Sequence, residues 1–158
     1  MTTIRQAEGA TDMATVRALF REYADWLGVD LSYQNFEREL AELPGAYAPP
    51  KGRLLLGEVA GNAVGCIALR PLEPDIGEVK RLYLRPDFQG RGLGRRLAET
   101  LVAEAHVIGY RALRLDTLAR LTAANTLYAS LGFRPIAPYY HNPHEGVLYY
   151  ELDLAASA

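Results

Sequence analysis

Apolar and polar residues alternate along several short stretches of this chain and recur at helical spacing along others. Alternation with period two is typical of strands, and apolar residues at every third or fourth position are typical of amphipathic helices. The pattern predicts strands at residues 3–7, 53–60, 63–70, 78–84, 111–117 and 146–154, with a further strand beginning at 133–134. It predicts helices that end at residue 27, over 33–43, from 93 to 108, and over 121–131.

Glycine, proline and capping residues mark the ends of these elements. Thr11 or Asp12 is suited to cap the first helix, and Gly28, Gly109 and Gly132 follow the ends of three helices. Gly61-Asn62 predicts a two-residue hairpin turn between two strands. Residues 71–77 are expected to form a turn-rich connection, and residues 135–145 a long loop.

The order of these elements predicts an α/β domain of the α+β type. Its sheet is mixed and largely antiparallel, with helices on both faces, and residues 1–158 form a single domain. A strictly alternating, doubly wound sheet needs a helix between the strands at 53–60 and 63–70. The hairpin turn at Gly61-Asn62 leaves no room for that helix, which argues against a dinucleotide-binding fold.

Composition narrows the classes of function. Hydrophobic residues make up 49% of the chain and charged residues 23%, as in an ordinary soluble protein. The net charge of −2 gives no electrostatic reason to expect nucleic-acid binding. No apolar run is long enough to span a membrane, the N-terminus has no apolar signal region, and a single cysteine forms no internal disulfide. We therefore expect a cytoplasmic protein.

A glycine-rich stretch, Gln89-Gly-Arg-Gly-Leu-Gly-Arg-Arg96, stands between a predicted strand and a predicted helix. Glycines let backbone N–H groups converge without side chains in the way, and a helix start adds unpaired N–H groups and a positive dipole end. Together with Arg91, Arg95 and Arg96 they predict a phosphate or pyrophosphate site.

Three templates compete for this loop. A P-loop requires Lys-Ser or Lys-Thr after the last glycine, and none follows here. A dinucleotide loop fits Gly90 and Gly92 but has Arg95 where a small residue must pack, although Asp116 lies at a suitable distance for ribose recognition. The third template, Q/R-x-x-G-x-G/A, is matched by Gln89, Gly92 and Gly94.

This last template is a signature of the GNAT superfamily of N-acetyltransferases, which the chain resembles. A second stretch, Asn125-Thr-Leu-Tyr-Ala-Ser-Leu-Gly-Phe133, is similar to the family's helix that carries Asn and Tyr and ends at Leu-Gly-Phe. The resemblance covers roughly residues 53–134 well and the N-terminal part loosely. It implies that the loop holds the pyrophosphate of acetyl-CoA and that the backbone at Leu82, Tyr83 and Leu84 pairs with the pantetheine arm. The implied cofactor residues of the two motifs are Gln89, Gly90, Arg91, Gly92, Leu93, Gly94, Arg95, Asn125 and Tyr128.

Acetyl transfer to an amine needs a base, a stabilised carbonyl oxygen and a protonated or held thiolate. By resemblance, Tyr128 is the acid for the thiolate and an amide at Leu82–Leu84 polarises the acetyl carbonyl. By resemblance, Glu78 is the predicted base, because several family members carry a glutamate at this strand position; an exposed charge at a strand edge is the alternative. Lys80 lies on the same strand face and is positioned to pair with Glu78, and Asp116 is an alternative base or a helix cap.

The amine acceptor is expected to be a small molecule or a peptide. By resemblance, its site is built by the first two helices and the loop before the last strand. Aromatic and acidic side chains there suit a small cationic amine, although they equally suit a core and a solvated face: Tyr23, Trp26, Tyr33, Phe36, Tyr139, Tyr140, Glu22, Asp25 and Asp30.

Further alternatives remain open from the sequence. His141 and His144 lie near Glu145, but no third spaced ligand is evident, so we expect no metal. The resemblance allows a homodimer. A non-catalytic acetyl-CoA-binding sensor is the alternative to an enzyme, and a dinucleotide-binding domain is a further one.

Overall fold

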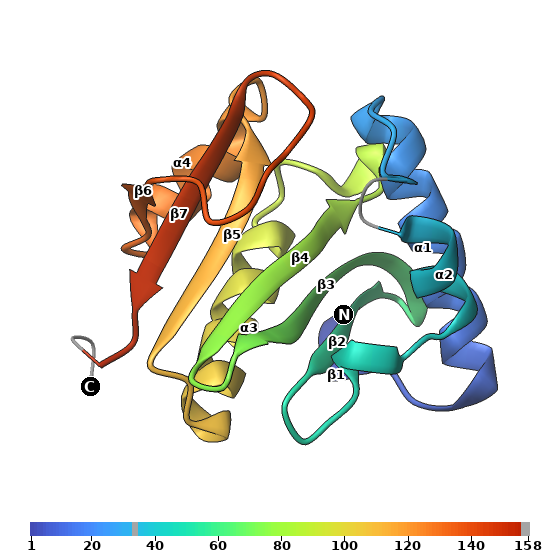
Figure 1. Cartoon of the computed structure of the whole chain (residues 1–158). Helices are drawn as coiled ribbons and strands as arrows, with labels where there is room; N and C mark the ends of the chain where they lie inside the picture. The colour runs from blue at the N-terminus through green and yellow to red at the C-terminus, as the bar shows by residue number, and fades with distance from the viewer. Residues whose placement is uncertain (33–34, 156–158) are drawn as a thin grey trace.

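Seven strands form one sheet in this computed structural model, which describes residues 1–32 and 35–155. The strand order is β1-β2-β3-β4-β5-β7-β6, and only β4 and β5 are parallel neighbours. Figure 1 shows helix α3 passing behind the central strands. The strands are β1 (Thr2–Gln6), β2 (Arg53–Val59), β3 (Asn62–Glu73), β4 (Ile76–Leu84), β5 (Ala112–Leu118), β6 (Arg134–Ile136) and β7 (Val147–Asp153). The predicted mixed, largely antiparallel sheet with helices on both faces is confirmed.

Helices and short 3-10 turns connect these strands. They are α1 (Gly9–Leu27), α2 (Phe36–Ala41), η2 (Gly45–Tyr47), η3 (Pro86–Phe88), α3 (Leu93–Ile108) and α4 (Thr122–Ser130). Helix α1 begins before the predicted caps Thr11 and Asp12. The Asp12 carboxylate lies inside the first turn and accepts the backbone N–H of Glu8 at 2.9 Å, which moves the start back to Gly9. Gly28 ends α1 in a left-handed conformation, as predicted.

The second predicted helix is shorter than the apolar pattern indicated. Helix α2 spans Phe36–Ala41 within the predicted range 33–43, of which residues 33 and 34 lie outside the described part. Phe36 and Leu40 are buried as predicted, and Leu43 packs against the same core from a turn beyond the helix.

The two hairpins differ in detail from the prediction. Ala60 and Gly61 are the turn residues, with φ of 51° and 82°, and Asn62 already pairs with Val59. The turn therefore falls one residue earlier than Gly61-Asn62. Strands β3 and β4 also run through most of the predicted connection at 71–77, because their ladder continues to the Glu73–Ile76 pair. Antiparallel pairing of β2 with β3 excludes a doubly wound dinucleotide fold.

Two apolar layers cover the two faces of the sheet. On one face, α1 and α2 pack with the alternate residues Leu54, Leu56, Cys66, Ala68 and Tyr83. On the other face, α3 and α4 pack with the intervening residues of the same strands, among them Leu55, Ile67 and Val79. Each layer buries apolar surface, which is the main stabilising term. Within the described ranges, no helix combines the length and apolar character that crossing a bilayer requires.

Candidate active site

Strands β4 and β5 separate towards their carboxyl ends, and this opening organises the site. They pair only from Ile76 to Glu78 on β4 and from Ala112 to Arg114 on β5. Figure 1 shows the two strands diverging above that point. Strand β4 also carries a bulge opposite β3, since Cys66 pairs with Tyr83 while Ala68 pairs with Lys80. Backbone groups of β4 beyond the bulge are thus left without a partner strand on the β5 side.

Arg81 is the bulged residue and holds a left-handed backbone with φ of 62°. Its buried guanidinium donates to both carboxylate oxygens of Glu39 at 3.0 and 2.8 Å. The guanidinium also lies over the rings of Tyr23 and Phe36, at 5.9 and 5.3 Å from their centroids. A non-glycine residue in this conformation is strained, and the bidentate ion pair with Glu39 anchors the side chain of this residue.

A groove of about 470 Å³ lies along the open edge of β4. It runs from the glycine loop, past β4, to the start of α4, and Trp26 of α1 borders it. Of the residues predicted to bind a cofactor, this groove is lined by Leu82, Tyr83, Leu84, Gln89, Gly90, Gly92, Gly94 and Arg95.

The glycine loop presents free backbone donors at one end of this groove. The first hydrogen bond of α3 runs from Arg96 N to Gly92 O, which leaves the amides of Leu93, Gly94 and Arg95 without an acceptor in the helix. Gly92 has φ of 81°, and a Cβ built there meets nothing within 4 Å. Gln89 fixes the loop by donating its side-chain amide to the Leu84 carbonyl at 2.9 Å. These groups fit a pyrophosphate.

Four other predicted cofactor residues lie elsewhere. Arg91 stacks on the Phe88 ring at 5.2 Å, and Leu93 is buried in α3. Asn125 donates its amide to the Leu118 carbonyl at 3.0 Å and so ties α4 to the end of β5. Tyr128 lines a neighbouring cavity instead of the groove. Their roles towards acetyl-CoA stay predictions.

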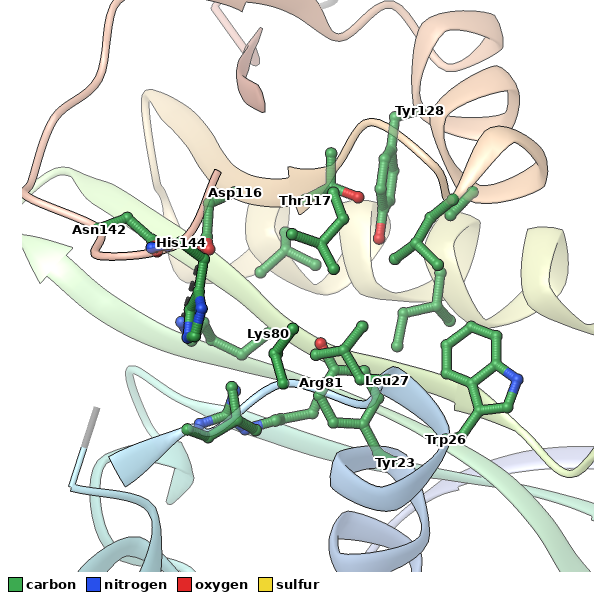
Figure 2. A pocket seen from close by; sticks show the side chains of 17 residues that line it. Tyr23, Trp26, Leu27, Lys80, Arg81, Asp116, Thr117, Tyr128, Asn142 and His144 are labelled. Carbon is green, nitrogen blue, oxygen red and sulfur yellow. Dashed lines mark hydrogen bonds and ion pairs between the residues drawn. The ribbon is translucent and has the colours of Figure 1, made fainter. Parts of the chain in front are cut away.

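A smaller cavity of about 70 Å³ adjoins the groove in the opening between β4 and β5. Both are lined by Trp26, Leu82, Leu121 and Ala124, which join them. The polar side chains that line the cavity come from five segments of the chain (Figure 2): Tyr23, Lys80, Arg81, Asp116, Thr117, Tyr128, Asn142 and His144. The sequence analysis named Tyr23, Lys80, Asp116, Tyr128 and His144 among these side chains, and it singled out none of Arg81, Thr117 and Asn142.

Tyr128 points its hydroxyl into this cavity, as Figure 2 shows. Its ring packs against Phe133 with centroids 5.7 Å apart. Burial raises the pKa of the Tyr128 hydroxyl above its ordinary value, and the nearby Tyr23 and Asp116 act in the same direction. The hydroxyl therefore stays protonated and is able to donate a proton or a hydrogen bond.

Glu78, the predicted base, is buried and already bound on both carboxylate oxygens. Oε1 accepts from Arg70 Nε at 2.9 Å, and Oε2 accepts from the Tyr139 hydroxyl at 2.7 Å. Its ion pair is with Arg70, not with Lys80 as the strand-face argument suggested, because the antiparallel register sets Arg70 directly opposite Glu78. Lys80 instead lies 3.6 Å from Asp116 Oδ1. Glu78 lines neither the groove nor the cavity.

The loop between β6 and β7 closes one side of the cavity. The Tyr140 hydroxyl donates to Asp116 Oδ2 at 2.8 Å, and Tyr149 donates to the Tyr140 carbonyl. The His144 ring contacts the Asp30 carbonyl at 2.9 Å, which links the loop to the segment after α1. In the described part of the chain, no group of three or more His, Cys, Asp or Glu side chains is arranged to hold a metal ion.

The acids expected to attract a cationic acceptor lie outside this cavity. Glu22 pairs with Arg85 at 2.9 Å, and Asp30 accepts from the Ser32 backbone and hydroxyl. Asp25 lines a separate hollow beside α2. Phe36 is core, and Tyr33 lies outside the described residues. Asp116 is therefore the carboxylate that faces the cavity.

Comparison with known proteins agrees with this architecture. The model of the acetyltransferase (GNAT) family matches residues 14–133. An uncharacterised N-acetyltransferase of Schizosaccharomyces pombe is 39% identical over 91% of this chain and 90% of its own length. An acetyltransferase structure from Streptococcus agalactiae superposes with a TM-score of 0.79, at 20% identity, over 96% of this chain and 98% of its own. An acetyltransferase of Salmonella typhimurium, solved with its cofactor acetyl-CoA, gives a TM-score of 0.70 at 22% identity over 98% and 94% of the two chains.

Proposed function

The chain belongs to the GNAT family of acetyltransferases, and we propose that this enzyme moves the acetyl group of acetyl-CoA directly to a primary amine of a small molecule or peptide. Acetyl-CoA supplies the acetyl group in activated form, as a thioester. The proposal extends to this chain the use of acetyl-CoA that the Salmonella typhimurium neighbour displays.

The observation that carries the proposal is the junction between the groove and the cavity at Leu82. The groove offers the amides of Leu93, Gly94 and Arg95 to a pyrophosphate and the open backbone of Leu82–Leu84 to an extended amide-bearing arm. An arm laid along that edge would bring its end to the cavity that holds Tyr128 and Asp116. The same strand therefore serves binding and chemistry.

Two side chains of the cavity suit the two proton transfers. Tyr128 keeps its proton because it is buried, and it would give that proton to the departing sulfur. Asp116 would take the proton that the acceptor amine loses, directly or through one water. A β4 amide beyond the bulge would stabilise the charge that develops on the carbonyl oxygen.

Glu78 stays a second candidate for the base. Its access to the cavity requires that the Tyr139 hydroxyl either move away or relay the proton, because that hydroxyl occupies Oε2. Asp116 has its Oδ2 taken by the Tyr140 hydroxyl, but it lines the cavity and, among the described residues, its Oδ1 faces only the Lys80 ammonium at 3.6 Å, so no hydroxyl needs to leave that oxygen. We therefore assign the role of base to Asp116. Glu78 has a positioning role, which it exerts through Tyr139 and Arg70.

Thiol release tests the proposal. The purified protein is incubated with acetyl-CoA and a panel of primary amines, and free coenzyme A thiol is followed over time. We expect amine-dependent release that is lost in Asp116→Asn. Thiol release that does not depend on any amine, across a panel of amino acids, peptides and polyamines, would contradict the proposed reaction.

A further inference from the structure

Lys80 carries a buried positive charge at the wall of the cavity. Its side chain is only 4% exposed, and its one ion-pair partner in the described structure, Asp116 Oδ1, lies 3.6 Å away. That distance exceeds the 2.7–2.9 Å of a charge-assisted hydrogen bond. Burying an ammonium is costly unless it is closely paired. Lys80 is therefore a cation with unused donor capacity, in contact with the cavity.

The arginines on the same face of the sheet are closely paired. Arg81 binds both oxygens of Glu39, Arg70 binds Glu78 at 2.9 Å, and Arg114 binds Glu151 at 2.8 Å. In Figure 2, Lys80 and Asp116 both border the cavity. Arg81 also lines the cavity, but its guanidinium is engaged by both oxygens of Glu39, so Lys80 is the loosely paired cation of the cavity wall.

Asp116 supplies the complementary half of the site. Its Oδ2 accepts from the Tyr140 hydroxyl, while Oδ1 faces the Lys80 ammonium across the 3.6 Å gap. A cation and an anion side by side in a small cavity are best complemented by a ligand that carries the opposite pair at short separation. An amino acid, with its amine and carboxylate two or three bonds apart, has that arrangement.

We propose that the acceptor is a free amino acid, whose carboxylate binds the Lys80 ammonium while its amine lies at Asp116. This inference rests on the proposed function, because it places the acceptor in the cavity where acetyl transfer is proposed. Asp116 takes one proton from the acceptor ammonium, which yields the neutral amine. The amine nitrogen bonds to the acetyl carbon as the bond from that carbon to sulfur breaks, and Tyr128 gives its proton to the sulfur. The second proton of the amine then returns to Tyr128. The acetylated product keeps the carboxylate and loses the positive charge, which weakens its hold on Asp116.

Amines of other classes match the charges of the cavity poorly. A polyamine would bring a second cation next to Lys80 and leave the buried ammonium without a close partner. A peptide N-terminus offers an amide where the free amino acid offers a carboxylate. Hydrogen bonds to a charged group are worth more than those to a neutral one, so the missing carboxylate should cost about 10- to 100-fold in affinity.

The test uses the wild-type protein and matched acceptors. Each of a set of amino acids is compared with its carboxamide and with the decarboxylated amine, at saturating acetyl-CoA, by thiol release. We expect kcat/KM for at least one amino acid to exceed that of both analogues, which lack the carboxylate, by about 10-fold or more. A wild-type enzyme that acetylates the carboxamides or decarboxylated amines as well as, or better than, the amino acids would overturn the proposal.

A lysine variant assigns that preference to Lys80. Lys80→Met should raise KM for the amino acid about 10- to 100-fold, leave kcat much less changed, and leave KM for the carboxamide near wild type. Lys80→Arg keeps the charge and should keep part of the preference. Lys51, the other lysine of the chain, is exposed, so Lys51→Met is the matched control and should change nothing.

The outcomes separate this inference from the proposed function. An equal loss of kcat in Lys80→Met with acceptors that have and that lack the carboxylate would mean a proton-transfer or structural role and would overturn carboxylate recognition. Acetyl-CoA affinity is measured for every variant to report on folding. Failure of acetyl-CoA to bind the wild-type protein would instead contradict the proposed function itself, whereas brisk acetylation of decarboxylated amines alone would leave that function standing.

Discussion

The Tyr139 hydroxyl lies 2.7 Å from Oε2 of Glu78 and covers a carboxylate that the sequence predicted to be the catalytic base. Burial and the charge of Glu78 raise the pKa of the Tyr139 hydroxyl, so it stays protonated and donates to Glu78. The other carboxylate oxygen is taken by Arg70. Glu78 therefore acts as the centre of a buried polar cluster that supports the loop before β7.

This relationship gives a first prediction, on Glu78→Gln. We expect the free energy of unfolding to fall by about 1–3 kcal/mol. The Arg70 guanidinium loses its charged partner, and because it is only partly exposed, water compensates only part of that loss. The rate at neutral pH should fall less than about 10-fold. Asp116→Asn is the comparison and should lower kcat by about 10²–10⁴, with recovery at high pH as free amine becomes available. The opposite ranking of the two variants would return the role of base to Glu78.

A second prediction concerns the glycine loop. Gly92→Ala should weaken acetyl-CoA binding by about 10-fold or more, because a methyl group there would stand where the pyrophosphate must approach. Gly109 at the far end of α3 is the matched control, since it also has a left-handed backbone and open space around a built Cβ. Gly92→Ala and Gly109→Ala should lose similar stability, of about 1 kcal/mol, and calorimetry should show weakened acetyl-CoA binding only in the first.

A third prediction concerns Tyr128. Tyr128→Phe should lower kcat by about 10-fold or more and leave acetyl-CoA affinity nearly unchanged, because the hydroxyl is needed only as the thiolate departs. Since burial raises the pKa of Tyr128, wild-type kcat should show no loss of this acid as pH rises to 10. Tyr110→Phe, which removes a hydroxyl bound to the Lys51 carbonyl, is the control. Parallel losses of binding and rate in Tyr128→Phe would point to a positioning role.

Some of the residues in these predictions could be identified from the sequence, and others could not. The glycine loop, α3 and the ends of both were predictable, because glycine spacing and helical periodicity are local signals. Tyr128 was reached through its family motif. The partners of Glu78 were not. Arg70 is close in sequence, but its position opposite Glu78 depends on the register of the β3–β4 hairpin, which contains bulges. Tyr139 comes from a loop far away in the chain.

The left-handed backbone at the Arg81 bulge could not be predicted from the sequence either. Nothing local marks an arginine for a left-handed backbone, a conformation that normally favours glycine. The conformation depends on the pairing of Arg81 with Glu39 across the molecule and on a shift in register against β3. The opening between β4 and β5 is likewise tertiary, since the pairing of the two strands ends at Glu78 and Arg114.

A fourth prediction tests this buried ion pair. Glu39→Gln should lower the free energy of unfolding by about 3–5 kcal/mol, because it leaves the Arg81 guanidinium, which is 2% exposed, without a charged partner. Glu42→Gln, next to α2, is the control and should stay near wild type, since its pair with Arg38 is solvent-exposed. Urea unfolding measures both. Equal stability of the two variants would show that the bulge holds without the ion pair.

A fifth prediction follows from the charge of Lys80. The pKa of Lys80 is lowered, chiefly by burial. The nearby carboxylates of Asp116 and Glu78 raise this pKa, and the positive charges of Arg81 and Arg70 lower it. An amino-acid carboxylate binds only the protonated form, so KM for that acceptor should rise as pH passes upward through the lowered pKa, below the ordinary value of about 10.4. KM for the carboxamide, measured over the same pH range, should not follow this course. Identical pH profiles of KM for both acceptors would count against Lys80 as the carboxylate partner.

The most direct test of the proposed reaction and its acceptor is mass spectrometry of the products. The purified protein is given acetyl-CoA and an equimolar mixture of amino acids and their carboxamides. We expect N-acetylated amino acids in amounts that match the coenzyme A released and that exceed those of the acetylated carboxamides, and we expect these products to be lost in Asp116→Asn. Coenzyme A released with no acetylated amine among the products, or acetylation that persists unchanged in Asp116→Asn, would contradict it.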